Sequence, residues 1–426
     1  MKGKADTREE KIAWKLTQIA ILALTIFLLF SILNSWSDSN KNNVQVTESI
    51  KPNDSTALPE STTPSSKNPE SVSSDSLNTE IISPKPPRTF TLIASGELLI
   101  HEFVAEKAAD YAETGFNFSP MFQRVKPILA GADLALCHLE TPLSSDNSEL
   151  SYYPKFQVPF ELAAAIAEAG YDGCSVASNH LLDNGLNGVT ATLSHLKKSG
   201  VSVSGSALNA DREAPALFAP SGVQVAHLSY TDTMNGHTMP INPPWLVGNL
   251  ETEKVITDAT NAISKGAEFV VVSLHFGEPA YQTELSTNQK AIADELLQSQ
   301  VVDLVIGHGA HVIQTVSHQN EKFAILGLGN FLSNQPGDNR RRCNECPPST
   351  QDGIMVWFEV AERPDGSFTV IDSGYVPTWV DRNTYEIIPL GINEPESVDP
   401  LVLLKSADRT KTVVEPTLRR ITFNNQ

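Results

Sequence analysis

The sequence has little of what marks a zinc ribbon or a nucleic-acid-binding protein. It has four cysteines among 426 residues, and no second close-spaced thiol pair accompanies Cys343 and Cys346, which argues against a zinc ribbon. The formal net charge is −19, and basic residues cluster only in the first residues and at 340–342. Because phosphate backbones are bound by clustered lysine and arginine, this distribution argues against a nucleic-acid partner.

A single uncharged apolar run occupies residues 16–33, LTQIAILALTIFLLFSIL. As a helix it would be roughly 27 Å long, close to the hydrocarbon thickness of a bilayer. Five basic residues precede it, so we expect residues 1–15 in the cytoplasm and the rest of the chain outside, as a single-pass cell-membrane protein. A cleaved signal peptide is the alternative, but Asn34 and the residues after it lack a small-x-small site, which favours an uncleaved anchor.

The composition changes after the apolar run. Residues 34–88 are rich in Ser, Asn, Thr, Pro and Glu and have almost no aromatic side chains. Such a segment cannot bury enough apolar area to offset the entropy of ordering, so we predict a disordered linker. With 40% hydrophobic residues, the remaining chain is long enough for one large domain, predicted over 89–389, with a C-terminal extension over 390–426.

The domain alternates short apolar runs with helical patterns, which predicts an α/β fold with a layered sheet flanked by helices. Strands are expected at 89–94, 133–136, 173–177, 223–229, 269–274, 303–306 and 323–326. Helices are expected at 160–169, 186–199, 251–265 and 287–300. After Asp352 the pattern becomes alternating around Pro364-Asp365-Gly366, which predicts an antiparallel hairpin beside the main sheet.

Polar residues follow five of these strands, at the point where each strand ends. Gly307 and Gly309 free the backbone around His308 and His311, which follow the strand at 303–306. The other such residues are Glu97 and His101, Glu140, Asn179 with His180 and Asp183, and His275. Ligands of open α/β sheets bind beyond the carboxyl ends of the strands, so we expect these side chains to converge at one rim.

Each of these residues has an ordinary structural role available to it. Together, carboxylates, an amide and several imidazoles are the mixture that holds one or two divalent metals with oxygen and nitrogen ligands. Two ions about 3.5–4 Å apart would support hydrolysis of a phosphoester. The pattern therefore predicts a metal-dependent hydrolase.

Several motifs resemble those of the CapA family of capsule and poly-γ-glutamate synthesis proteins, which has a calcineurin-like metallophosphatase fold. They occur in the family's order over about 89–389: GELLIHE, CHLETPLS, PFELAAAIAEAGYDGCSVASNHLLDNG, HFGEP, VIGHGAHVIQ and LGNF. The resemblance implies a metallophosphatase-like layered core, ligation of two divalent ions (Mn, Zn or Fe), and partners among poly-γ-glutamate synthase and export components.

Carried over by motif, the resemblance implies six metal ligands, Glu97, Glu140, Asn179, His275, His308 and His311. It makes His180 the histidine beside the leaving group, oriented by Asp183, and leaves His101 as a further ligand or substrate contact. The family normally has Gly-Asp where this chain has Gly96-Glu97. Many relatives also have His-Pro-His where this chain has Gly309-Ala310-His311.

Two hypotheses follow. One is an envelope hydrolase acting on a phosphoester. The other is a non-catalytic assembly or export subunit, which the Glu97 departure and the acidic composition favour. For the cysteines, we expect buried thiols at Cys137 and Cys174, and either a short-loop disulfide or no bond between Cys343 and Cys346.

Overall fold

The structure is a computed structural model, and it describes residues 86–210, 215–240, 242–337 and 343–422. The predicted anchor at 16–33 and most of the predicted linker lie outside the described residues. Among the residues described, no helix has both the length and the apolar content needed to cross a bilayer.

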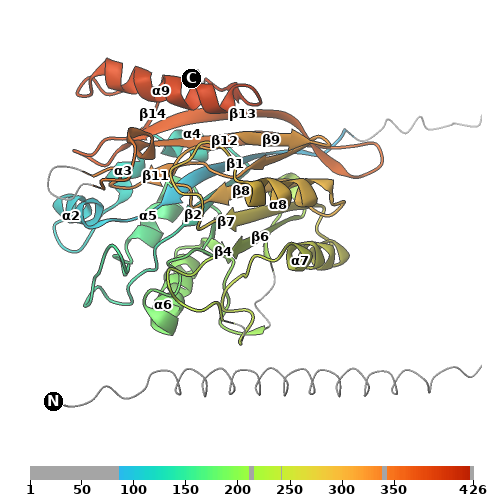
Figure 1. The fold of residues 1–426 in the computed structure, drawn as a ribbon, viewed down its shortest axis with the longest axis horizontal. Helices are drawn as coiled ribbons and strands as arrows, with labels where there is room; N and C mark the ends of the chain where they lie inside the picture. Colours follow the sequence, from blue (N-terminus) through green and yellow to red (C-terminus); the bar gives the residue numbers. More distant parts are fainter. Residues whose placement is uncertain (1–85, 211–214, 241, 338–342, 423–426) are drawn as a thin grey trace, which may run out of the picture. The chain divides into compact units, whose positions relative to one another are not determined.

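Two β-sheets form the centre of the domain (Figure 1). The first runs in the order β14 (Ile387–Pro389), β13 (Phe368–Val380), β12 (Asp352–Glu362), β1 (Thr89–Leu98), β2 (Leu134–Leu139), β3 (Gly173–Ser175), β4 (Ser202–Ser204), with β11 (Asn330–Leu332) on β1 and β15 (Arg419–Arg420) on β13. The second runs β5 (Ala216–Phe218), β6 (Val225–Thr231), β7 (Phe269–His275), β8 (Leu304–His308), β10 (Lys322–Ile325), β9 (Val316–Gln319).

The sheets pack face to face because side chains alternate along each strand. On β1, Leu92 lies in the apolar cluster between the sheets, whereas Ile93 lies in the cluster formed with the helices. On β7, Val271 faces the first sheet and Val272 faces the opposite side. Both faces of the parallel strands are therefore covered, which explains why they read as continuous apolar runs.

Helices cover the outer faces of both sheets (Figure 1). On the first sheet lie α2 (Glu102–Asp110), α3 (Ser119–Phe122), α4 (Lys126–Leu129), α5 (Leu162–Ala169) and α6 (Gly185–Lys198). On the second lie α7 (Thr252–Ser264) and α8 (Thr287–Gln298), the latter begun by a capping box between Ser286 and Gln289. The layers are thus helices, sheet, sheet and helices.

The predicted C-terminal hairpin is confirmed, since β12 and β13 pair in antiparallel register. Helix α9 (Pro400–Val414) packs against this hairpin and β14, where Leu403 and Ala407 meet Trp379 and Ile388. An ion pair adds to this contact: Nε of the partly exposed Arg409 on α9 lies 2.7 Å from a carboxylate oxygen of the buried Asp352. Part of the predicted C-terminal extension therefore belongs to the folded domain.

Three expectations need correction. The strands that carry the polar residues belong to two sheets and not to one. Among the described strands, β6, β7 and β8 pair with one another and with β5 and β10, and none of them pairs with a strand of the first sheet. Strand β1 runs four residues past Ala94 to Leu98, since it also pairs with β11 there, so Glu97 lies within a strand. Cys137 and Cys174 are not free thiols: they lie opposite each other in β2 and β3 with Cα atoms 4.4 Å apart, and they form a disulfide.

A second disulfide joins Cys343 and Cys346, three residues apart. It closes a short loop beside the 3-10 turn at Pro348–Gln351. Sequence analysis left open whether Cys343 and Cys346 are bonded, and the structure has the disulfide.

Candidate metal centre

Glu140 lies at the centre of the candidate site, just after the end of β2. Its side chain is buried, and neither carboxylate oxygen has a hydrogen-bond partner among the described residues. The Ser178 hydroxyl donates to its backbone carbonyl at 2.7 Å, which fixes the turn after β3 against it. A buried carboxylate without partners is costly, and protonation or a bound cation relieves that cost.

Two groups of potential ligand atoms meet at Glu140. His138, Glu140 and His275 form one, and Glu97, Glu140 and His311 form the other, with the ligand atoms of each group within 4.8 Å of one another. Both groups combine strands of the first sheet with strand ends or loops of the second. Nitrogen and carboxylate oxygen ligands of this kind suit Zn, Mn or Fe.

The first group rests on stacked imidazoles. Nε2 of His138 lies 3.1 Å from Nδ1 of His275, across the gap between the sheets, and Nδ1 of His138 contacts the Ser175 hydroxyl at 2.8 Å. The His308 ring lies parallel to that of His138, with centroids 4.0 Å apart. Burial and the neighbouring imidazoles lower the pKa of His138, His275 and His308 well below 6.5, which keeps them in the neutral form that binds metals.

The second group is held by Glu97. One of its carboxylate oxygens accepts from the backbone N–H of Gly309 at 2.7 Å, and the other lies 2.6 Å from Nδ1 of His311. Burial lowers the pKa of His311, but the carboxylates of Glu97 and Glu140 outweigh it and hold that pKa above the ordinary value. Burial, together with the Glu97 carboxylate, raises the pKa of Glu140 to about 7 against the opposing effect of His311.

Gly309 makes this contact possible. Its φ of +97° belongs to the left-handed region, and a Cβ there would overlap the carbonyl oxygen of Phe276. Only glycine fits both constraints, so the residue predicted to free the turn also places the amide that binds Glu97.

His180 and Asp183 form a second functional unit beside Glu140. Nδ1 of His180 lies 2.6 Å from Oδ2 of Asp183, and Nε2 of His180 lies 4.0 Å from the Glu140 carboxylate. Asp183 also accepts from the Phe156 backbone N–H at 2.8 Å. The imidazole is therefore fixed with its free nitrogen toward the carboxylates.

Two further predicted ligands also fit a metal. Oδ1 of Asn179 and Nδ1 of His308 are both buried and have no partner among the described residues. Together with the two carboxylate oxygens of Glu140, they make four buried atoms that could each bind a metal and that have no hydrogen-bond partner among the described residues. All four lie at one rim of the two packed sheets. The residues present therefore fit divalent ions, although His308 belongs to neither of the two close groups.

His101 lies elsewhere. It precedes α2, its Nδ1 lies 3.1 Å from the Leu99 carbonyl, and it is outside both ligand groups. Burial and the nearby His311 lower its pKa to about 4. It lines a neighbouring cavity instead, a position that suits contact with substrate.

Sequence reasoning missed His138 and Asn330. His138 follows the predicted strand at 133–136 and belongs to the CHLETPLS motif, but it was not chosen as a ligand; the structure extends β2 to Leu139, and the spacing of two between His138 and Glu140 puts both on one side of the strand. Asn330 lies opposite Glu97 in the β1–β11 pairing, and its buried Oδ1 has no partner among the described residues. The LGNF motif was the signal for it.

Comparison with known proteins decides the family. The family described as bacterial capsule synthesis protein PGA_cap matches residues 91–335, more than half of the chain. The chain belongs to the PGA_cap family. The matched residues include both ligand groups, His180 and Asp183.

Two curated relatives agree with this PGA_cap assignment. The chain is 26% identical over 276 residues to "Capsule biosynthesis protein CapA" of Bacillus anthracis, covering 60% of this chain and 64% of that protein. It is 23% identical over 300 residues to "PGA biosynthesis protein CapA" of Bacillus subtilis, covering 69% and 70%. The chain thus spans about two thirds of each relative's length.

Solved structures are more distant from this PGA_cap protein. Calcineurin-like phosphoesterase YfkN from Bacillus subtilis is 15% identical with a TM-score of 0.42, covering 77% of this chain and 98% of that chain. The NAD nucleotidase of Haemophilus influenzae is 9% identical with a TM-score of 0.41, covering 78% and 57%. At these scores neither likeness carries a function over.

Proposed function

We propose that this protein is a membrane-anchored, extracytoplasmic member of the PGA_cap family that serves capsule or poly-γ-glutamate synthesis by hydrolysing a phosphoester with divalent metal ions. The names of the two Bacillus relatives support the proposed role in capsule or poly-γ-glutamate synthesis. The uncharged run at 16–33 supports the anchor. The partners proposed with it are synthase and export components in the same membrane.

One observation carries the enzymatic half: the buried, unpartnered carboxylate of Glu140, shared by two groups of potential ligands. His138, His275, Glu97 and His311 would hold the ions with it, and Asn179 and His308 would complete the set. A bound divalent ion acts as a Lewis acid on a phosphoester oxygen.

The chain's own residues supply the remaining chemistry. Asp183 fixes His180 by accepting from Nδ1, which leaves Nε2 free to deliver a proton to the leaving oxygen. The Asn235 amide donates to the second Asp183 oxygen at 3.3 Å, so this carboxylate is held from two directions. The imidazole therefore needs no reorientation during the reaction.

The test is turnover of bis-p-nitrophenyl phosphate by the full chain, with and without bound metal. We expect turnover that chelation abolishes and that Mn²⁺ or Zn²⁺ restores, and that is lost in His275→Ala. The matched control is His318→Ala, which removes an exposed imidazole on β9. Full activity in metal-free protein would refute the enzymatic half of the proposal.

A specific observation keeps the non-catalytic alternative in view. Both Glu97 oxygens are satisfied by protein donors, Gly309 N–H and His311, so this corner of the site needs no ion to be stable. An assembly or export subunit would still support capsule formation in cells when His180 and His275 are both alanine. A hydrolase would not.

A further inference from the structure

A buried serine hydroxyl on β3 contacts an imidazole of the candidate metal centre. Oγ of Ser175 lies 2.8 Å from Nδ1 of His138, and the same hydroxyl donates to the Cys137 backbone carbonyl at 3.3 Å. Ser175 belongs to neither ligand group. Any effect of this hydroxyl on the centre must therefore pass through His138.

The position of the Ser175 hydroxyl is fixed by the first sheet. Ser175 and His138 are direct partners in the parallel pairing of β3 with β2. The residues immediately before them, Cys174 and Cys137, form the disulfide that joins these two strands. On its other edge β3 pairs with β4. Strand β3 is thus held on both sides, and Oγ stays within hydrogen-bond distance of the imidazole.

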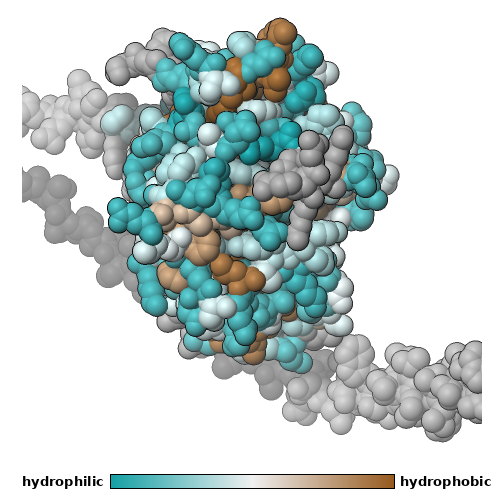
Figure 2. All heavy atoms as spheres, turned by 90° about the vertical axis from the view of Figure 1, so that its left-hand side faces the viewer, coloured by the Kyte–Doolittle hydropathy of each residue, from teal (hydrophilic) through white to brown (hydrophobic). Residues whose placement is uncertain are grey.

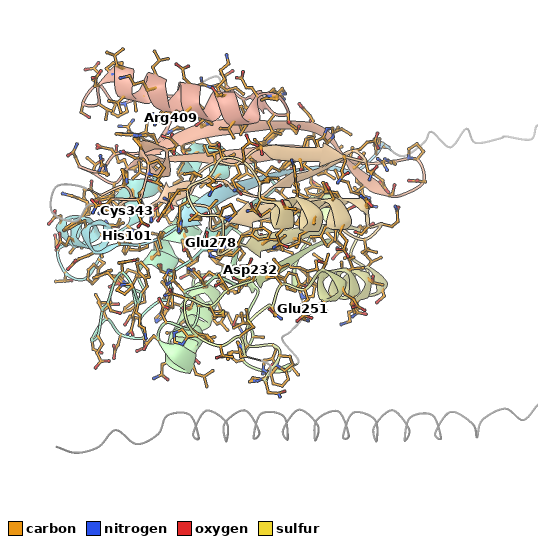
Figure 3. All side chains as sticks on the ribbon, in the orientation of Figure 1. His101, Asp232, Glu251, Glu278, Cys343 and Arg409 are labelled. Atoms are coloured by element: carbon orange, nitrogen blue, oxygen red, sulfur yellow. A yellow bond between two sulfur atoms is a disulfide. The ribbon has the colours of Figure 1, made fainter. Side chains whose placement is uncertain are left out.

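The contact continues from His138 into the second sheet. Nε2 of His138 lies 3.1 Å from Nδ1 of His275, at the end of β7. Asp232, labelled in Figure 3, follows β6, and its backbone N–H donates to the His275 carbonyl at 3.2 Å. The Cys137 carbonyl, the Ser175 hydroxyl and the two imidazoles therefore form one continuous series, which we call the Ser175 series.

The Ser175 series is shielded from solvent. The surface in Figure 2 is mostly hydrophilic, with separate brown patches. In contrast, Ser175 is 0% exposed, and His138 and His275 are each 1% exposed. Bulk water therefore does not replace the hydroxyl when it is removed, and Nδ1 of His138 would lose its partner at the cost of a buried, unsatisfied polar group.

The number of protons in the Ser175 series limits how it can be arranged. A neutral imidazole has one N–H and one lone pair, and a hydroxyl has one proton. The Cys137 carbonyl can only accept, so the Ser175 proton directed to it leaves Oγ to accept from Nδ1 of His138. Nε2 of His138 then carries the lone pair. In the reverse arrangement Nε2 carries the proton, and this nitrogen cannot bind a metal.

We propose that Ser175 is a positioning residue of the metal centre: its hydroxyl accepts the Nδ1 proton of His138 and so directs the Nε2 lone pair of that imidazole toward His275. A hydrogen bond from the second ring nitrogen commonly fixes the tautomer and orientation of a metal-ligating histidine. The consequence for metal binding rests on the proposed function, whereas the position of the proton does not.

The first measurement locates this proton in metal-free protein. The full chain, labelled with ¹⁵N-histidine, is studied by NMR in detergent with EDTA at about pH 8, where an ordinary imidazole is neutral. The ¹⁵N shifts of the His138 ring, assigned by their loss in His138→Gln, distinguish a protonated nitrogen from an unprotonated one. We expect the proton on Nδ1 in the unaltered chain and a loss of this preference in Ser175→Ala.

The second measurement is the affinity for Zn²⁺ alone, by competition with a metal-sensitive dye. We expect Ser175→Ala to weaken it by about 10–100-fold, the usual effect of removing a partner of a metal-ligating histidine. The matched control is Ser273→Ala on β7. It also removes a buried hydroxyl that contacts an imidazole at 2.8 Å, but that imidazole is His227, outside both ligand groups. Ser273→Ala should change neither the His138 proton nor the affinity.

Two results would overturn the inference: a proton on Nε2 of His138 in the unaltered chain, or equal effects of Ser175→Ala and Ser273→Ala on Zn²⁺ affinity. The proton is located without metal or turnover. If Nδ1 carries the proton but the unaltered chain binds no metal, the proposed function fails and the position of the proton stands. If the chain binds Zn²⁺ and turns over the phosphodiester with the proton on Nε2, only this inference fails.

Discussion

Glu97 of the first sheet contacts His311 of the loop after β8, with 2.6 Å between a carboxylate oxygen and Nδ1. The family pattern has aspartate at this position, and glutamate extends the carboxylate by one methylene. The longer side chain reaches far enough to bind both His311 and the Gly309 amide. A carboxylate that binds a metal-ligating imidazole orients it and raises its basicity, which is a role for Glu97 even without direct ligation.

Shortening this side chain should loosen the second ligand group. In Glu97→Asp we expect both contacts to be lost and metal affinity to fall by about 10–100-fold, as for other partners of metal-ligating histidines. Competition with a metal-sensitive dye measures this affinity. Glu106→Asp, on α2 and outside both groups, should leave the affinity unchanged. Equal affinities for Glu97→Asp and the unaltered chain would show that the Glu97–His311 contact does not support metal binding.

Gly309→Ala should destabilise the domain. The added Cβ overlaps the Phe276 carbonyl oxygen, and alanine is strained at φ +97°; together these effects should cost about 2–4 kcal/mol. Gly200→Ala separates the two effects, since Gly200 also has positive φ, at +84°, but has open space around it. Urea unfolding should show the larger loss for Gly309. Similar losses in both variants would mean that the close approach to Phe276 is not needed.

Asp183→Asn should lower phosphodiester turnover by about 10²–10⁴-fold, the range of a positioned general acid. The amide can no longer accept from Nδ1 of His180 as a carboxylate does, so the ring loses its fixed orientation. Bound metal should stay unchanged, because Asp183 is outside both ligand groups. The control is Asp294→Asn on α8, an exposed carboxylate. Should turnover survive in Asp183→Asn, the role given to His180 would be wrong.

His227 makes the domain sensitive to acid. His227 lies on β6 and is fully buried, and its Nε2 contacts the Ser273 hydroxyl on β7 at 2.8 Å. Burial lowers the pKa of His227 to about 3. Below pH 6.5 the unfolded chain takes up a proton here that the folded chain does not, so stability falls as pH decreases from 6.5 toward 3 and is unaffected above 6.5.

Removing this imidazole should therefore reduce the loss of stability on acidification. We expect His227→Phe to show a smaller fall in melting temperature between pH 7 and pH 5 than the unaltered chain. His318→Phe, at an exposed position, should not reproduce the change. An undiminished fall in His227→Phe would show that His227 does not contribute to acid sensitivity.

The sequence predicted the strands and helices of the core well, because buried parallel strands are short apolar runs and their helices are amphipathic. All seven predicted strands overlap β1, β2, β3, β6, β7, β8 and β10. The division into two sheets was not predictable in this way. Periodicity tells which residues are buried and does not tell which strands pair.

Two parts of the fold had signals that periodicity alone does not capture. Helix α9 begins at Pro400, and Asp399 before it is the N-cap residue; this order of residues is a helix-start signal. The contact between Glu97 and His311 joins residues 214 positions apart in the chain, and nothing local predicts it. Motif order brought most of the candidate ligands to one rim, whereas His138 became evident only once β2 and β7 were seen to face each other.

The central claim is that Glu140 holds divalent metal, and elemental analysis of the purified full chain tests it most directly. The unaltered protein and Glu253→Gln, which alters an exposed carboxylate on α7, should carry the same amount of Mn, Zn or Fe. Glu140→Gln should carry far less, since it removes the buried charge while keeping the side chain's size. Metal in Glu140→Gln equal to that in the unaltered protein, or none in either, would contradict the account.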